Sequence, residues 1–225
     1  MNELDYRYDS FFATILQLDT DEKLIIPPNF NLVSWNYDFQ VEKAFMNFTE
    51  ETLSETLNRL NVLGTIHKKV ETLDGSASFL TKLNGTAAFA KDNSFTTLFD
   101  FHQHTLNKES LDVIINILTE KRDSVDTGMR FAWNRNELSK DAVQKAHIKF
   151  IEANIIVILG YSFPYFNGEI DRQLFQGVGH GSVPKIYIQC HKDDTASVVN
   201  RFKGVCDVHP IQFTELDQFL IPNEL

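Results

Sequence analysis

The sequence has few cysteines and no long apolar run. Its only cysteines are Cys190 and Cys206, and neither belongs to a C-x-x-C pair, so a four-cysteine zinc site is excluded. A disulfide stays open, although single cysteines are more typical of reduced thiols. No apolar run approaches the roughly 20 residues that cross a bilayer. The first residues also lack the basic and apolar regions of a signal peptide. We therefore expect a cytoplasmic protein without a membrane partner.

Basic residues are also scarce. Lysine and arginine number 21 against 31 acidic residues, which gives a formal net charge of −10. This balance disfavours nucleic acid as a partner, because phosphate backbones are bound through clustered cations. A small phosphorylated ligand remains compatible, since backbone N–H groups at helix N-termini can hold a phosphate. The 225 residues are 43% hydrophobic and include 19 phenylalanines, which predicts a folded chain with a sizeable core.

The apolar pattern alternates between strand and helix and therefore predicts an α/β fold with a doubly wound, mostly parallel sheet. We expect one domain over residues 1–225, with a helical cap or insertion at residues 87–138. The predicted helices cover residues 9–18, 39–48, a stretch from an N-cap at Thr49 to a C-cap at Gly64, a stretch from an N-cap at Ser139 to Phe150, and residues 168–175 and 196–202. The predicted strands cover residues 30–34, 76–83, 155–159 and 185–190, with a short one near Ile211.

Three compact polar residues follow the strand at residues 30–34. They are Ser34, Asn36 and Asp38, and a helical pattern begins directly after them. Polar side chains at the carboxyl end of a buried strand are typical of ligand sites in open α/β sheets. An Asx turn between strand and helix uses the same residue types and is the simpler interpretation of these residues alone.

Three further loops follow predicted strands, namely Asn84-Gly85-Thr86, Gly160-Tyr161-Ser162 and the region of Gln189. Because the carboxyl ends of parallel strands share one edge of a sheet, all four loops are expected to face one crevice. In this order and strand context, the motifs resemble those of the sirtuin-like NAD-binding family, within it the bacterial sirtuin-like NAD hydrolases. The resemblance covers residues 31–191 and implies a sirtuin-like Rossmann fold.

The resemblance also implies a role for each matching residue. Asn36 matches the asparagine that meets the nicotinamide amide and its ribose, and Asp38 matches the acidic residue beside it. Gly160 and Ser162 match residues near the phosphates and the adenosine ribose, and Gln189 a polar residue at the adenosine half. Ser34 and Gly85, in the first two loops, complete the expected contacts with NAD or an ADP-ribose-like nucleotide.

The chain departs from the family at two points. The position of the family's motif histidine, which accepts a proton from the ribose, holds Asn84, and an amide cannot serve as a general base. No Gly-rich phosphate turn precedes Leu32, so the chain either lacks this motif or is truncated. We therefore expect a degenerate domain that binds a nucleotide weakly or serves as an interaction module. An engineered replacement at Asn84 stays open.

Two alternatives to the degenerate domain remain. One is an NAD glycohydrolase of a bacterial defence system that recruits another base, such as His180. The other is a purely structural sheet whose phenylalanine-rich surface joins copies of the chain into a homo-oligomer, or joins the chain to a different one.

Other chemistries receive little support from the sequence. His102 and His104 share a face of an extended segment, but no third ligand accompanies them, so no metal is expected. His147 falls on the inward face of its helix and is expected in the core. Ser162 lacks the second glycine of a nucleophile elbow, which excludes a serine hydrolase.

Overall fold

The computed structural model describes residues 5–64, 80–91, 94–97, 99–100, 105–106, 108, 111–112, 115, 126–134 and 137–224. The contacts divide the chain into two compact units. The central unit comprises residues 17–142, and the terminal unit joins residues 1–16 to residues 143–225. That both belong to one domain stays a prediction.

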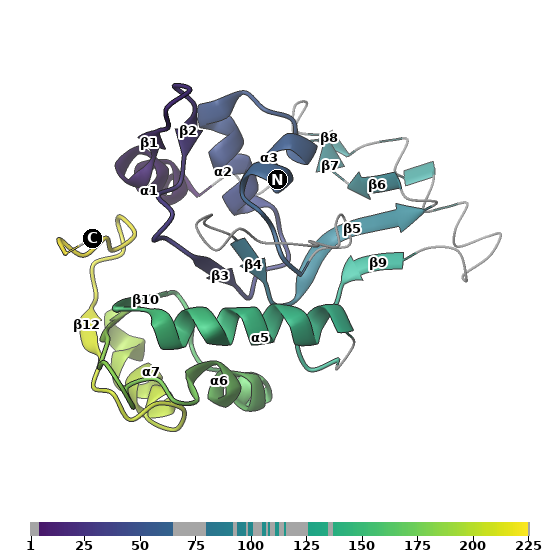
Figure 1. Ribbon diagram of the computed structural model, residues 1–225. Coiled ribbons are helices and arrows are strands. Elements are labelled where there is room, and N and C mark those ends of the chain that lie inside the picture. The colour runs from purple at the N-terminus through teal and green to yellow at the C-terminus, as the bar shows by residue number, and fades with distance from the viewer. Residues whose placement is uncertain are drawn as a thin grey trace. The chain divides into compact units, whose positions relative to one another are not determined.

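The described residues form six α-helices and twelve strands (Figure 1). The helices are α1 (Tyr6–Ile15), α2 (Gln40–Thr49), α3 (Leu53–Arg59), α5 (Glu137–Glu152), α6 (Gly168–Phe175) and α7 (Thr195–Phe202). The strands are β1 (Gln17–Leu18), β2 (Leu24–Ile25), β3 (Leu32–Ser34), β4 (Leu80–Lys82), β5 (Gly85–Lys91), β6 (Ser94–Thr97), β7 (Phe99–Asp100), β8 (Thr105–Leu106), β9 (Asp126–Met129), β10 (Ile155–Leu159), β11 (Lys185–Gln189) and β12 (Ile211–Phe213).

The terminal unit contains a three-stranded parallel sheet in the order β10-β11-β12. Helix α6 lies between β10 and β11 in the chain, and α7 lies between β11 and β12, as the sequence pattern predicts (Figure 1). Ile156, Ile186 and Ile188 are buried in the sheet. The buried rings of Phe175 and Phe202, one from each helix, pack edge to face with centroids 5.4 Å apart.

The first helix belongs to this unit because it packs against the C-terminal tail. The rings of Tyr8 and Phe219 meet edge to face at 4.8 Å. The Arg7 guanidinium lies 4.8 Å from the centroid of the same Phe219 ring. These contacts connect residues more than 200 positions apart in the sequence, which no local pattern predicts.

In the central unit, β3 pairs in parallel with β4, and Leu63 adds an isolated parallel bridge to Thr81. Helix α2 buries Ala44 and Phe45 on its apolar face. Helix α3 begins at a capping box in which Thr52 and Glu55 each bond the other's backbone N–H. Strand β5 pairs antiparallel with β6 and β9.

The structure confirms an α/β chain with parallel strands. These strands occur in the β10-β11-β12 sheet and the β3-β4 pair, and no large doubly wound sheet is present among the described residues. Residues 87–138 were expected to form a helical cap, but the part of this segment that the structure describes lies mainly in strands β5 to β9. The rest of residues 87–138 lies outside the described residues.

Several predicted boundaries were wrong. Helix α1 ends at Ile15, so Leu18 lies in β1 instead. Thr49 is the last residue of α2, which ends because Glu50 adopts a left-handed conformation at φ 53°. Ser139 lies inside α5, where it is buried, and does not cap it.

Two further expectations need correction. Gly64 does not cap α3, which ends at Arg59; its φ of 79° lets the backbone approach the Lys82 carbonyl, where a Cβ would lie 2.1 Å from the oxygen. The five successive aliphatic residues of β10 are typical of a strand buried on both faces, but only Ile156 and Ile158 among them are buried, and the alternate residues are partly exposed.

Candidate functional site

The carboxyl ends of β3 and β4 lie side by side in the central unit. Ser34 is the register partner of Lys82, the last residue of β4. The two loops that follow, residues 34–38 and residues 83–87, are therefore brought together, as the sequence predicts for neighbouring parallel strands.

The Ser34–Asp38 loop is hydrogen-bonded to a segment that runs from Lys82, at the end of β4, to Ala87. Four of its five backbone carbonyls accept a bond from that segment: Ser34 from the Leu83 N–H at 2.9 Å, Trp35 from Asn84 Nδ2 at 2.8 Å, Tyr37 from the Ala87 N–H at 2.7 Å, and Asp38 from Lys82 Nζ. The fifth carbonyl, that of Asn36, accepts a bond from Ser34 Oγ at 3.4 Å. The loop thus has a fixed backbone.

The polar side chains of this loop have different roles. Ser34 Oγ accepts a bond from the Asn36 N–H at 3.1 Å. Asp38 accepts bonds from the backbone and side-chain nitrogens of Gln40, both at 3.2 Å, and so forms an Asx turn that starts α2. The simpler interpretation is therefore confirmed for Asp38. The side-chain amide of Asn36 is exposed and has no hydrogen-bonding partner within the described part of the chain.

Asn84 connects three segments. Its Nδ2 donates to the Trp35 carbonyl at 2.8 Å, its Oδ1 accepts from the Ala132 N–H at 3.2 Å, and its own carbonyl accepts from the Arg130 N–H at 3.0 Å. Both ends of the side-chain amide are thus engaged with backbone groups. An amide in this setting orients its surroundings and does not exchange a proton.

A buried ion pair lies beneath the loop, and the sequence analysis missed it. Lys82 Nζ is 3.1 Å from Glu42 Oε1, and both side chains are completely buried. Burial raises the pKa of Glu42, and attraction to the Lys82 ammonium opposes that rise. The signal in the sequence was a lysine at the end of a predicted strand and a glutamate beside the apolar stripe of α2. The pair fixes the start of α2 to the end of β4.

Gly85 is required by the backbone. Its φ is 70°, and a Cβ there would lie 2.0 Å from the carbonyl oxygen of Gly128 in β9. Any other residue would force β5 and β9 apart. This close approach explains the glycine without a ligand, so its predicted contact with a cofactor stays a prediction.

Three predicted cofactor residues lie in the terminal unit. Gly160 follows β10 with a φ of 61°, and a Cβ there would meet nothing within 4 Å. Ser162 is exposed. The buried amide of Gln189 donates to the carbonyls of Glu215 and Gln218 and accepts from the Leu220 N–H at 3.0 Å, so it holds the C-terminal tail.

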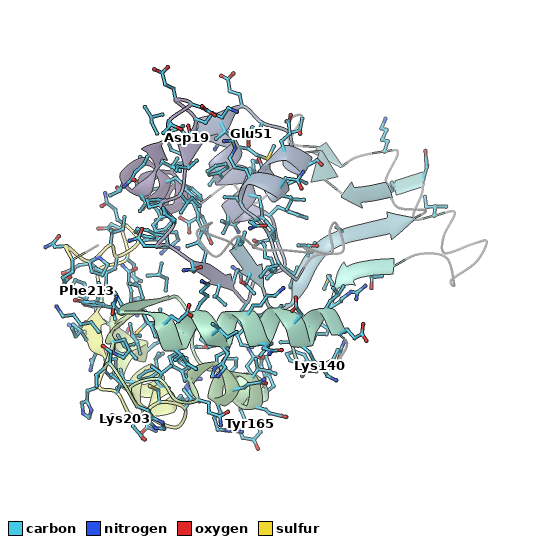
Figure 2. The ribbon with its side chains drawn as sticks, in the orientation of Figure 1. Asp19, Glu51, Lys140, Tyr165, Lys203 and Phe213 are labelled. Atoms are coloured by element: carbon cyan, nitrogen blue, oxygen red, sulfur yellow. The ribbon has the colours of Figure 1, made fainter. Side chains whose placement is uncertain are left out.

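A polar cluster beside Ser162 was not foreseen. The Tyr161 hydroxyl donates to Asp171 at 2.9 Å and accepts from Asn167 Nδ2 at 2.9 Å. Burial raises the pKa of Asp171 to about 7, and the bond from Tyr161 opposes the rise. The Oδ1 atom of Asn167 is buried and has no hydrogen-bonding partner among the residues that the structure describes. Tyr165 and Phe166, close by in the chain, are exposed, and Tyr165 points away from the ribbon in Figure 2.

Two cavities of the terminal unit have linings that do not include Tyr161, Asn167 or Asp171. One, of about 550 Å³, is lined by residues of α6 and by residues 203–207, beginning at Lys203 (Figure 2). The other, of about 490 Å³, is lined by residues 175–180 and 205–209 and includes His180 and His209. Neither contains a residue that the sequence analysis assigned to the nucleotide.

The predicted site residues are thus divided between the units. Ser34, Asn36, Asp38, Asn84 and Gly85 come together in the central unit, while Gly160, Ser162 and Gln189 belong to the terminal unit. His102 and His104 lie outside the described residues. Among those that are described, no three histidine, cysteine or acidic side chains gather as metal ligands.

Comparison with known proteins gives no family. The chain matches no protein-family model, and no curated protein is similar to it in sequence. None of the helices within the described ranges is both long and apolar enough to cross a membrane.

Proposed function

We propose that this protein is a degenerate sirtuin-like domain that binds NAD or an ADP-ribose-type nucleotide weakly and turns over little or none of it. The observation that carries the proposal is the contrast between the side chains of Asn36 and Asn84. Asn36 offers a free amide on a fixed loop, while the amide of Asn84 is engaged with backbone groups. Such a loop can orient a ligand, but this pair supplies no base to cleave it.

The fixed backbone of the Ser34–Asp38 loop supports a role in ligand binding rather than a role only in connecting β3 to α2. A loop whose carbonyls are all hydrogen-bonded loses little conformational freedom when a ligand arrives. A free amide presents a donor and an acceptor in a defined direction, which suits the carboxamide of nicotinamide or a ribose hydroxyl. We propose weak affinity because residues 1–31 contain no glycine and therefore offer no Gly-rich turn for the phosphates.

The proposal also includes the fold and the location of the protein in the cell. We take the β3-β4 pair and the β10-β11-β12 sheet as parts of one sirtuin-like, doubly wound arrangement in a cytoplasmic protein. Gly160, Ser162 and Gln189 then remain candidates for the adenosine half of the ligand.

The test is incubation with NAD while free nicotinamide is followed by chromatography. The original chain is expected to release none, and titration calorimetry with ADP-ribose is expected to show weak binding. Asn36→Ala should abolish that binding. Asn84→His supplies a titratable ring at the motif position, and release of nicotinamide by this variant alone would identify a silenced hydrolase. Rapid release by the original chain would contradict the proposal.

An NAD glycohydrolase is the alternative, because the free amide of Asn36 would serve cleavage as well as binding. It requires a base other than Asn84, for which the sequence offers His180. Under this alternative the original chain releases nicotinamide and Asn36→Ala does not, while His180→Ala loses activity. Activity that survives Asn36→Ala would show that the loop is not the site.

A further inference from the structure

Exposed aromatic side chains belong to the two segments that Asn84 connects by hydrogen bonds. In the described part of the central unit, the exposed aromatic side chains are those of Tyr37 (47% exposed), Phe131 (38%) and Trp133 (40%). Tyr37 belongs to the Ser34–Asp38 loop, and its carbonyl is bonded to Ala87. Phe131 and Trp133 flank Ala132, whose N–H binds the Asn84 side chain. These side chains therefore occur beside the one hydrogen-bonded network that carries the proposed site.

Phe131 and Trp133 form a stacked pair. Their ring centroids are 4.7 Å apart, and the ring planes differ by only 4°. A turn closed by a 2.8 Å bond from the Asn134 N–H to the Phe131 carbonyl holds the two residues. Ala132, between them, is buried and tied to Asn84. The pair is consequently anchored at its backbone, while both residues stay partly exposed to solvent.

We propose that the Phe131–Trp133 pair is a stacking platform for the planar heteroaromatic ring of a nucleotide. The inference rests on the proposed function and assigns the ring-binding part of that site. A stacked pair of partly exposed rings can accept a further ring without any hydrogen-bond pattern, because every base has a π-face. The free amide of Asn36 lies one residue from the Trp35 carbonyl that Asn84 binds, so ring stacking and polar contacts belong to one network.

Tryptophan fluorescence reports on this platform directly. The chain has only two tryptophans, Trp35 and Trp133, and both belong to this network. A Trp35→Phe background leaves Trp133 as the single reporter, and all fluorescence comparisons are made within that background. Titration with AMP, nicotinamide mononucleotide, NAD and ADP-ribose should quench Trp133. Ribose 5-phosphate, which has no ring, should not.

Removal of one ring tests the contribution of stacking. Calorimetry in the same background compares Phe131→Leu, which removes a ring, with Phe131→Tyr, which keeps it. Trp133→Leu and Trp133→Phe are compared in the same way in the otherwise unchanged chain. Each leucine variant should weaken ADP-ribose binding about tenfold, and each aromatic variant should retain most of the affinity. Circular dichroism verifies that every variant is folded.

The outcomes separate this proposal from the proposed function. ADP-ribose affinity that is unchanged in folded leucine variants overturns the platform and leaves the function standing. If NAD and ADP-ribose fail to bind while AMP quenches Trp133 and the leucine variants lose that binding, the platform stands and the function fails. If no ringed ligand affects Trp133 or binds in calorimetry, the platform is wrong.

Discussion

The side-chain amide of Asn84 donates a 2.8 Å hydrogen bond to the backbone carbonyl of Trp35. This bond connects two loops that are 49 residues apart in the sequence. It also places the Asn84 side chain where it holds the backbone next to Asn36, the free amide of the proposed site.

Asn84→Ala should lower the free energy of unfolding by about 1 to 3 kcal/mol, because the Trp35 carbonyl and the Ala132 N–H both lose a partner. Asn84→Asp keeps the bond from Ala132 but brings a carboxylate against the Trp35 carbonyl. The pKa of this carboxylate is expected to rise in the folded state. The loss in the free energy of unfolding of Asn84→Asp should therefore be large at pH 8 and smaller at pH 4. Urea unfolding at both pH values measures this. An alanine variant as stable as the original would contradict the structural role.

Lys82→Met should destabilise the protein by about 3 to 5 kcal/mol, since it leaves the buried Glu42 carboxylate without its cation. Glu42→Gln in the same chain should restore much of this loss, because neither charge then needs a partner. A double-mutant cycle by urea unfolding gives the coupling. Lys149→Met is the control: its pair with Glu152 is partly exposed and should contribute less than about 0.5 kcal/mol. Equal losses at the two lysines would show that burial of the Lys82 pair does not matter.

Gly85→Ala and Gly160→Ala should have unequal effects, although both glycines have positive φ. At Gly160 the space for a methyl group is open, so only the left-handed conformation costs stability, by about 1 to 2 kcal/mol. At Gly85 the methyl group would also collide with the Gly128 carbonyl in β9, and the loss should be several times larger. Thermal unfolding compares the two variants, and equal melting temperatures would contradict the close approach.

The stability of the terminal unit should depend on Asp171. Its folded pKa is raised from 3.8 to about 7, so between these pH values the folded state binds more protons than the unfolded state. Stability that is fully present near pH 4 is therefore lost as the pH rises to about 7, by on the order of 2 to 4 kcal/mol. Asp171→Asn keeps an acceptor for Tyr161 and should remove this slope. Urea unfolding from pH 4 to 8 measures the free energy of unfolding of both proteins. If it changes with pH in the same way in both, the role of Asp171 is refuted.

Much of the secondary structure follows from local patterns. Strand β10 is five aliphatic residues in a row, and α6, β11 and α7 follow in the predicted order. The start of α3 was also readable, because Thr52 and Glu55 have capping-box spacing. The acidic residues after Thr49 resemble a first helical turn and led to the wrong cap. The left-handed Glu50 that ends α2 has no signature in the sequence.

The candidate site was only partly predictable. Polar residues after β3 and β4 were visible in the sequence, and parallel pairing brings them together. The role of each of these residues was not predictable, because it depends on which hydrogen-bonding groups the other loop supplies. Asp38 starts a helix and Asn84 holds two backbone groups, while Asn36 stays free. The Lys82–Glu42 pair joins residues 40 positions apart, and neither the strand nor the helix period reveals it.

The C-terminal tail contacts every second residue of β11. Lys185 and Tyr187 both bond to Glu224, and Gln189 bonds to residues 215, 218 and 220. Successive strand residues point to opposite faces, so these three side chains share one face. A slip of β11 by one residue would present Ile186 and Ile188 to polar partners that they cannot satisfy. The tail therefore fixes the register of β11, because its polar groups find partners only in the native alignment.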